Sequence, residues 1–149
     1  MVLSQRSQYA VRAIMELAKR EGLGPVKAAQ IAEAQFIPVR FLENILGQLR
    51  QAGIVESARG KDGGHRLRRK AQQITVGEVV RIMQGPMSAI DCVKAEMGPD
   101  CPLRVGCVLL PMWERAHQAM MDVYDATDFQ DLVEQEARVN GCEALEYAI

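Results

Sequence analysis

Apolar residues in the first third of the chain recur at the three- and four-residue spacing of amphipathic helices. One such helix is expected over residues 9–18, with Ser4 or Ser7 placed to cap its start. The same spacing predicts a short second helix over residues 26–34 and a third helix over residues 39–51.

The second and third of these helices, with residues 35–38 between them, predict a helix-turn-helix. The buried stripe of the third helix is expected to consist of Phe41, Leu42, Ile45, Leu46 and Leu49. Its opposite face carries Arg40, Glu43, Asn44 and Gln48. Because the early residues of the second helix of this motif read the major groove, we expect those four polar side chains to contact DNA.

A hairpin rich in glycine and cations is predicted next. The pattern indicates a strand over residues 54–57, a tight turn over residues 59–64 and a return strand that begins at His65. Residues 57–70 contain six Lys/Arg and one Asp, which suits contact with phosphates or with a narrow minor groove. We expect this wing to contact DNA through Arg59, Lys61 and Arg66. His65 either packs at the base of the hairpin, the favoured interpretation, or meets a phosphate.

The second half of the chain is again helical, around a loop that holds cysteines. A helix capped by Thr75 is expected to end at Gly85, and a long amphipathic helix is expected over residues 108–124. A last, short helix is expected over residues 127–133. An apolar helix of this length after a small winged-helix body is expected to pair with its twin in a homodimer, which would match a palindromic operator.

These elements predict a mainly α fold with a small β-wing. We expect a winged helix-turn-helix domain over residues 1–85, a cysteine loop over residues 86–107, and a dimerisation helix with an acidic tail over residues 108–149. Charge supports this division, because residues 1–85 carry 14 Lys/Arg against 7 Asp/Glu and residues 86–149 carry 4 against 12. The basic part is the expected face for double-stranded DNA.

No export signal is recognisable, and no apolar run approaches the roughly 20 residues of a membrane span. A cytoplasmic protein without a membrane partner is therefore expected. No paired acid/base or nucleophile motif indicates an enzyme.

Three cysteines, Cys92, Cys101 and Cys107, lie in a loop that also contains glycine and proline. Thiolates are soft ligands, so zinc and iron–sulfur clusters are the metal centres that such a loop is expected to bind. The gaps of eight and five residues lack the paired spacing that is usual for zinc. The residues alone also allow a thiol switch or inert buried cysteines, and the fourth cysteine, Cys142, lies far along the chain.

The chain resembles the IscR, NsrR and RirA family of winged-helix transcription regulators. The resemblance lies, in family order, in residues 9–13, the helix-turn-helix over 29–52, the wing over 59–67, the helix over 74–85 and the cysteine triplet. The resemblance implies a homodimer that holds a 2Fe-2S or 4Fe-4S cluster through Cys92, Cys101 and Cys107. It also implies that the cluster senses iron, redox state or nitric oxide and so controls operator binding, most often as a repressor.

The resemblance leaves the fourth cluster ligand unknown. Gln8 stands where NsrR-like members have an aspartate, and Leu110 stands where IscR-like members have a histidine. Loop carboxylates, Cys142, water or a small thiol remain candidates. Two other classes of function stay open, a cluster-free thiol-switch repressor and a redox protein built on the cluster.

Overall fold

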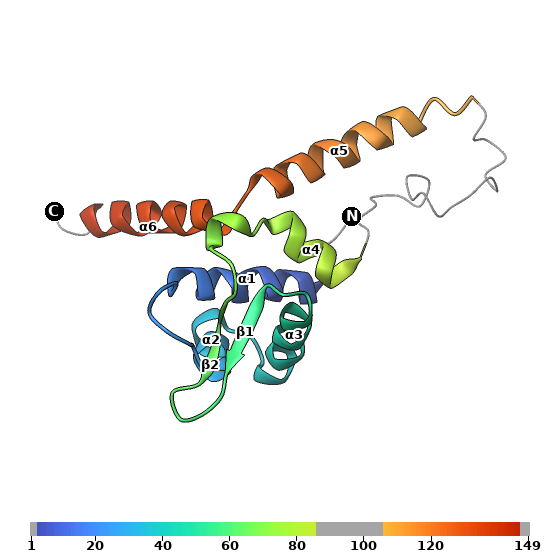
Figure 1. Ribbon diagram of the computed structural model, residues 1–149. Helices are drawn as coiled ribbons and strands as arrows, with labels where there is room; N and C mark the ends of the chain where they lie inside the picture. Colours follow the sequence, from blue (N-terminus) through green and yellow to red (C-terminus); the bar gives the residue numbers. More distant parts are fainter. Residues whose placement is uncertain (1–2, 86–105, 147–149) are drawn as a thin grey trace.

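The computed structural model describes residues 3–85 and 106–146. Helices α1 (Gln5–Lys19), α2 (Ala28–Gln35) and α3 (Val39–Gln51) pack together beside a two-stranded antiparallel sheet. The strands are β1 (Val55–Ala58) and β2 (Gly64–Leu67), paired so that Glu56 faces Arg66 and Ala58 faces Gly64. The predicted winged helix-turn-helix with a small sheet in a mainly helical chain is confirmed (Figure 1).

The chain continues through a short 3-10 helix, η1 (Ala71–Gln73), into α4 (Val76–Gln84). Helices α5 (Leu110–Ala126) and α6 (Phe129–Glu146) follow and lie on the side of the body opposite the wing, with α5 extending away from it (Figure 1). None of the described helices combines the length and the apolar character needed to cross a bilayer.

One apolar core joins α1, α2, α3 and α4. Its fully buried members from these helices are Ala10, Ala13, Ile14, Ile31, Leu42, Ile45, Leu46, Leu49, Val79 and Val80. These positions recur every three or four residues, so each helix turns a single apolar side toward the others. Burying one of the isoleucine, leucine or valine side chains contributes about 1.5–3 kcal/mol before the cost in conformational entropy.

The caps explain where the helices begin and end. The Ser4 side chain accepts a hydrogen bond from the Ser7 N–H, and the Thr75 hydroxyl accepts one from the Glu78 N–H. Gly85 closes α4 with a φ of 77°, a left-handed value that favours glycine. The expected cap at Thr75 and the end at Gly85 are confirmed, and of the two candidate caps for α1 the structure uses Ser4.

Two sequence-based predictions about these helices were wrong. Phe41 was expected in the buried stripe of α3, yet its side chain is 58% exposed, because helical spacing fixes the direction of a side chain but not whether a neighbour lies opposite it. Helix α2 starts at Ala28 rather than at Val26, because Val26 pairs in extended conformation with His65 of β2.

The last helix was expected to be short, and this prediction was also wrong. Helix α6 has 18 residues, and the Asp128 carboxylate supports its start by accepting a hydrogen bond from the Asp131 N–H at 2.9 Å. Phe129 is completely buried in the core, and its N–H donates to the Ile74 carbonyl at 3.2 Å. Lys19 of α1 pairs with Glu136 at 3.0 Å. Helix α6 therefore packs on the winged-helix body at its start and along α1.

Candidate nucleic-acid interface

The exposed side of α3 is presented by a tight turn from α2. The Ile37 N–H donates to the Ala32 carbonyl at 2.9 Å and the Ile37 side chain is buried, which anchors the turn to the core. Arg40, Glu43 and Asn44 are exposed on the first half of α3. The Asn44 side-chain amide donates to the Arg40 carbonyl at 3.2 Å. The structure thus brings three of the four predicted α3 contacts together on an open surface.

Gln48, the fourth predicted contact on α3, has a different environment. Its side chain is half-buried, and its amide oxygen is enclosed without a hydrogen-bond partner among the described residues. A buried carbonyl oxygen without a partner is costly, so this amide is constrained by its surroundings more than the other three side chains are. Gln48 remains a predicted DNA contact, but one that would have to reach DNA from within a partly closed site.

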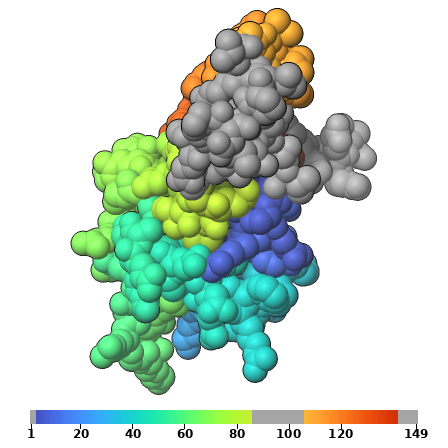
Figure 2. Space-filling view, turned by 90° about the vertical axis from the view of Figure 1, so that its right-hand side faces the viewer, coloured from blue at the N-terminus to red at the C-terminus, as the bar shows by residue number. Residues whose placement is uncertain are grey.

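The wing presents its free cations at its tip. Arg59 and Lys61 lie in the turn between the strands, are exposed, and form no ion pair with any residue that the structure describes. Arg66 instead pairs across the sheet with Glu56, its partner in the strand register. The wing tip and the chain around residue 40 project toward the same side of the molecule, below the helical body (Figure 2). The phosphate-binding role predicted for the wing therefore falls mainly on Arg59 and Lys61.

A backbone pairing fixes the wing to the helix-turn-helix. The Val26 N–H donates to the His65 carbonyl at 2.8 Å, and the His65 N–H donates to the Val26 carbonyl at 2.7 Å. This close approach requires glycine at the neighbouring position, since a Cβ on Gly64 would lie 2.5 Å from the Val26 carbonyl oxygen. Val26, two residues before α2, thus holds β2 in place, so that the wing and α3 keep one relative position.

Replacing Gly64 with alanine is expected to destabilise the fold by about 1–3 kcal/mol, because the added methyl group meets backbone atoms that cannot move without breaking the Val26–His65 pair. Denaturant unfolding measures the change. Gly47→Ala is the matched control, since a Cβ there meets nothing within 4 Å and helix propensity favours alanine by up to about 1 kcal/mol. Equal stability of the Gly64 variant and the unchanged protein would contradict the close approach.

His65 is packed on the wing, which supports the favoured interpretation, but the strand register places it one pair from the turn and not at the base of the hairpin. Its ring is half-buried, and its Nδ1 lies 3.1 Å from the Ser57 hydroxyl on the paired strand. Burial lowers the pKa of His65 below its ordinary value, and the Arg50 cation of α3 lowers that pKa further, while Glu43 acts in the opposite direction. The lowered pKa favours the neutral form of this imidazole.

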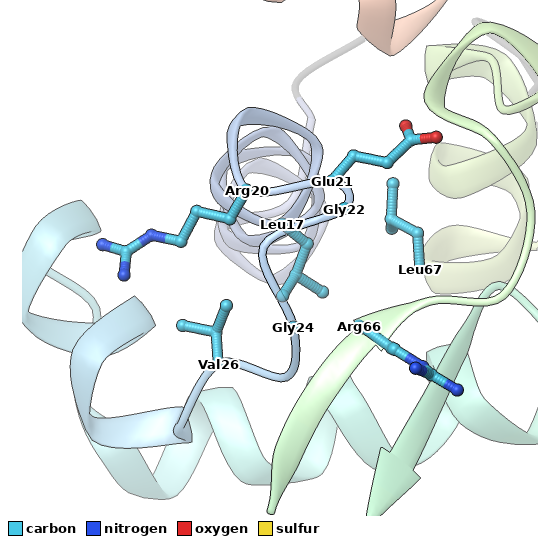
Figure 3. A pocket seen from close by; sticks show the side chains of 8 residues that line it. All are labelled: Leu17, Arg20, Glu21, Gly22, Gly24, Val26, Arg66 and Leu67. Carbon is cyan, nitrogen blue, oxygen red and sulfur yellow. The ribbon is translucent and has the colours of Figure 1, made fainter. Parts of the chain in front are cut away.

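A pocket of about 200 Å³ lies between the end of α1 and β2. Figure 3 shows Leu17, Val26 and Leu67 lining it, while the guanidinium groups of Arg20 and Arg66 point away. Arg20 pairs with Glu16, and Glu21, also at the pocket wall, accepts a hydrogen bond from the Ala71 N–H. The charged groups around the pocket thus form ion pairs or hydrogen bonds with residues outside it. The pocket is therefore a gap between the helical body and the wing, and not a ligand site with polar groups that point inward.

Of the three predicted cluster ligands, the structure describes only Cys107. Its thiol is free and half-buried, three residues before α5 begins. Cys92 and Cys101 lie outside the described residues, and the side chain of Cys142, in α6, also lies outside them. Within residues 3–85 and 106–146, no group of three or more His, Cys, Asp or Glu side chains is placed to hold a metal ion. The ligand triplet therefore remains a prediction.

Helix α5 contacts the body along one side only. Met121 is its one buried residue, and Arg81 of α4 pairs with Asp125 near its end. Most of its remaining surface is open, including the large apolar side chains of Met112 and Val123 on the helix and of Val108 and Leu109 just before it. An apolar helix surface of this extent is typical of a protein–protein contact.

Comparison with known proteins places the whole arrangement in one family. The model of the Rrf2 family, described as "Iron-dependent Transcriptional regulator", matches residues 3–135. The transcriptional regulator CymR of Bacillus subtilis is 32% identical over 142 residues, which cover 92% of this chain and 96% of that protein. Protein rrf2 of Nitratidesulfovibrio vulgaris is 33% identical over 133 residues, covering 89% of this chain and 87% of that protein.

Solved structures agree with these sequence relatives. The structure of B. subtilis CymR, described as the global cysteine regulator, has a TM-score of 0.76 and 30% identity, and the match covers 91% of this chain and 98% of that one. The T. potens IscR structure has a TM-score of 0.75 and 29% identity, with 91% and 88% covered. The resemblance inferred from the helix-turn-helix, the wing and the cysteines is confirmed, and the chain belongs to the Rrf2 family of transcriptional regulators.

Proposed function

We propose that this regulator binds a palindromic DNA operator as a homodimer, with α3 in the major groove and the wing tip on the neighbouring minor groove. The observation that carries the proposal is the shared orientation of the open side of α3 and the cationic wing tip, held by the Val26–His65 backbone pair (Figure 2). Arg40 and Asn44 are exposed and can meet base edges or phosphates, and Arg59 and Lys61 can meet phosphates.

The homodimer part of the proposal rests on α5. Helix α5, which carries uncovered apolar side chains, lies on the opposite side of the body from the wing (Figure 1). Two copies can therefore pair through α5 without blocking either DNA-binding surface. A pair of this kind is related by a two-fold axis, which places two α3 helices in a symmetric relation. A palindromic operator has the same symmetry.

Arg40→Ala and Arg59→Ala are each expected to weaken DNA binding, by about 1–3 kcal/mol for a base contact. A lost phosphate contact lowers the salt slope of binding by about one unit, whereas a lost base contact relaxes preference at one position. Titration of operator duplex at several salt concentrations separates the two. Arg138→Ala, which removes an exposed α6 cation paired with Glu134, is the control. If both variants bind like the unchanged protein, α3 and the wing are not the interface.

We further propose that Cys92, Cys101 and Cys107 hold an iron–sulfur cluster, of the 2Fe-2S or 4Fe-4S type. The matching family is described as iron-dependent, and the free, half-buried thiol of Cys107 is a soft donor suited to iron. Such a cluster supplies a centre that responds to iron supply, oxidation or nitric oxide. With no more than three cysteines in the loop, the fourth ligand remains open.

The position of Cys107 suggests how the thiols act on DNA binding. Cys107 leads into α5, α5 contacts α4, and α4 packs on α1 and α3. A ligand or bond that restrains Cys107 therefore also restrains the start of α5. Through α4, it changes the distance between the two α3 helices of a dimer. Coupling of about 1–3 kcal/mol between the sites is enough for regulation.

A cluster-free thiol switch is the second candidate. CymR, described as a global cysteine regulator, matches nearly the whole chain, and the Staphylococcus aureus CymR structure described as an oxidised form has a TM-score of 0.70 with 31% identity. In this alternative the thiols of the loop change oxidation state without iron. Iron and acid-labile sulfide in protein purified without air support the cluster, whereas their absence, together with redox-dependent DNA binding, supports the switch.

A further inference from the structure

Phe36, in the turn between α2 and α3, has an unusual backbone and an unusual exposure. Its φ is 50° and its ψ is 48°, and it has the only positive φ among non-glycine residues in the described parts of the chain. A bulky residue rarely adopts this left-handed conformation. Its side chain is nevertheless 86% exposed, so no burial of the ring within the protomer compensates for the strain.

Phe36 is the C-cap of α2, where a left-handed residue lets the chain leave the helix, and its N–H donates to the Glu33 carbonyl at 3.3 Å. Contacts of the residues on both sides then hold the turn in place. The Gln35 carbonyl accepts a hydrogen bond from the Arg12 guanidinium, and the Gln35 side-chain amide donates to the buried Glu16 carboxylate at 2.9 Å. Burial alone would raise the pKa of Glu16, but hydrogen bonds from Gln35, Arg20 and Lys19 outweigh it and keep that pKa low. On the other side, Ile37 is buried in the core. The ring of Phe36 is thus held outward by a rigid turn.

Val39 extends this apolar feature onto α3. It lies in the first turn of the helix, three residues after Phe36, and is 45% exposed. The next residue is the exposed Arg40, and the cationic wing tip projects toward the same side (Figure 2). An excess of Lys/Arg in residues 1–85 favours a polyanion over an apolar protein surface as the partner at this position.

We propose that Phe36 and Val39 contact thymine methyl groups in the major groove, which makes Phe36 a specificity-determining residue. The inference rests on the proposed function, since it requires α3 to enter the groove by its first turn. Thymine is the base that presents an apolar group in the major groove, and apolar side chains read it by contact with that methyl. The strained turn sets the ring in advance, so that little side-chain freedom is lost on binding.

The first test is Phe36→Asn, with an operator selected by the unchanged protein from random duplexes. Asparagine tolerates the left-handed backbone and no buried area is lost, so the melting temperature is expected to stay or rise. Affinity for the selected operator is expected to fall about tenfold, while affinity for random duplex stays the same. Val139→Asn is the matched control, because Val139 is an exposed apolar residue of α6, away from the wing.

The second test replaces each thymine of that operator in turn with deoxyuridine, which removes only the methyl group. At one or two positions the unchanged protein is expected to lose about fourfold in affinity, the value for one apolar carbon. At the position that Phe36 contacts, Phe36→Asn is expected to lose nothing further, whereas a methyl that Val39 contacts would cost both proteins the same. This cycle separates a methyl contact from a contact with sugar or phosphate, which the missing methyl leaves unchanged.

Unchanged operator affinity of Phe36→Asn overturns the inference, as do deoxyuridine penalties that are equal in both proteins at every position. If Arg40→Ala and Arg59→Ala still weaken binding in that case, the proposed DNA interface stands and only the role of Phe36 fails. If the unchanged protein selects no duplex at all, the proposed function fails and the inference fails with it. Loss of binding to another protein, with operator binding intact, would assign Phe36 to a protein contact instead.

Discussion

Replacing Cys92, Cys101 or Cys107 with serine is expected to abolish the bound iron of protein purified without air and to leave DNA affinity fixed. Each change removes one thiolate, and serine is a poor ligand for iron in a cluster. The core of the body lies in α1 to α4, so these variants are expected to remain folded and dimeric. Iron and sulfide assays measure the cluster, and operator titrations with and without iron, oxygen or nitric oxide measure the response.

Cys142→Ser is the matched control for this set. It also removes one thiol, but from α6, which lies beyond α5 in the chain, so most of the iron is expected to remain. Two results would contradict the sensor hypothesis. One is unchanged protein that holds zinc alone after cluster reconstitution, and the other is a triplet variant that still responds to the signals. Neither result would contradict the DNA-binding proposal.

A charge at Ala116 is expected to break the dimer. Ala116 is exposed on α5 of the isolated protomer, and in the proposed pair a glutamate there would be buried without a partner, at a cost of several kcal/mol. Sedimentation of Ala116→Glu is expected to show monomer at concentrations where the unchanged protein is dimeric. Affinity for the full palindrome is expected to fall toward that for a half-site.

Met120 also lies in the predicted contact, but it makes a less clean test. It is half-buried and packs against the core of its own protomer, so a charge there also disturbs folding. Ala137→Glu supplies the control, since Ala137 is exposed on α6 and not on α5. An unaltered dimer in the Ala116 variant, with normal folding, would remove α5 from the interface.

Much of the site could be predicted because its signals are local. The positions of Arg40, Glu43 and Asn44 follow from helical spacing, and those of Arg59 and Lys61 follow from a glycine-rich hairpin with cations at its tip. The environment of Gln48 could not be predicted in this way, since burial of its amide oxygen depends on what lies against α3. The same limit applies to Arg66, whose ion pair with Glu56 depends on strand register.

The order of the helices, the cap at Thr75 and the wing could be inferred from the amino-acid sequence, because periodicity, capping residues and turn glycines act within a few residues. The packing of distant segments against one another places Val26 beside β2, Phe129 in the core and α6 on α1. It also holds Phe36 outward, since two contacts from α1 fix the preceding residue. Such contacts join segments far apart in the chain, and no local pattern specifies them.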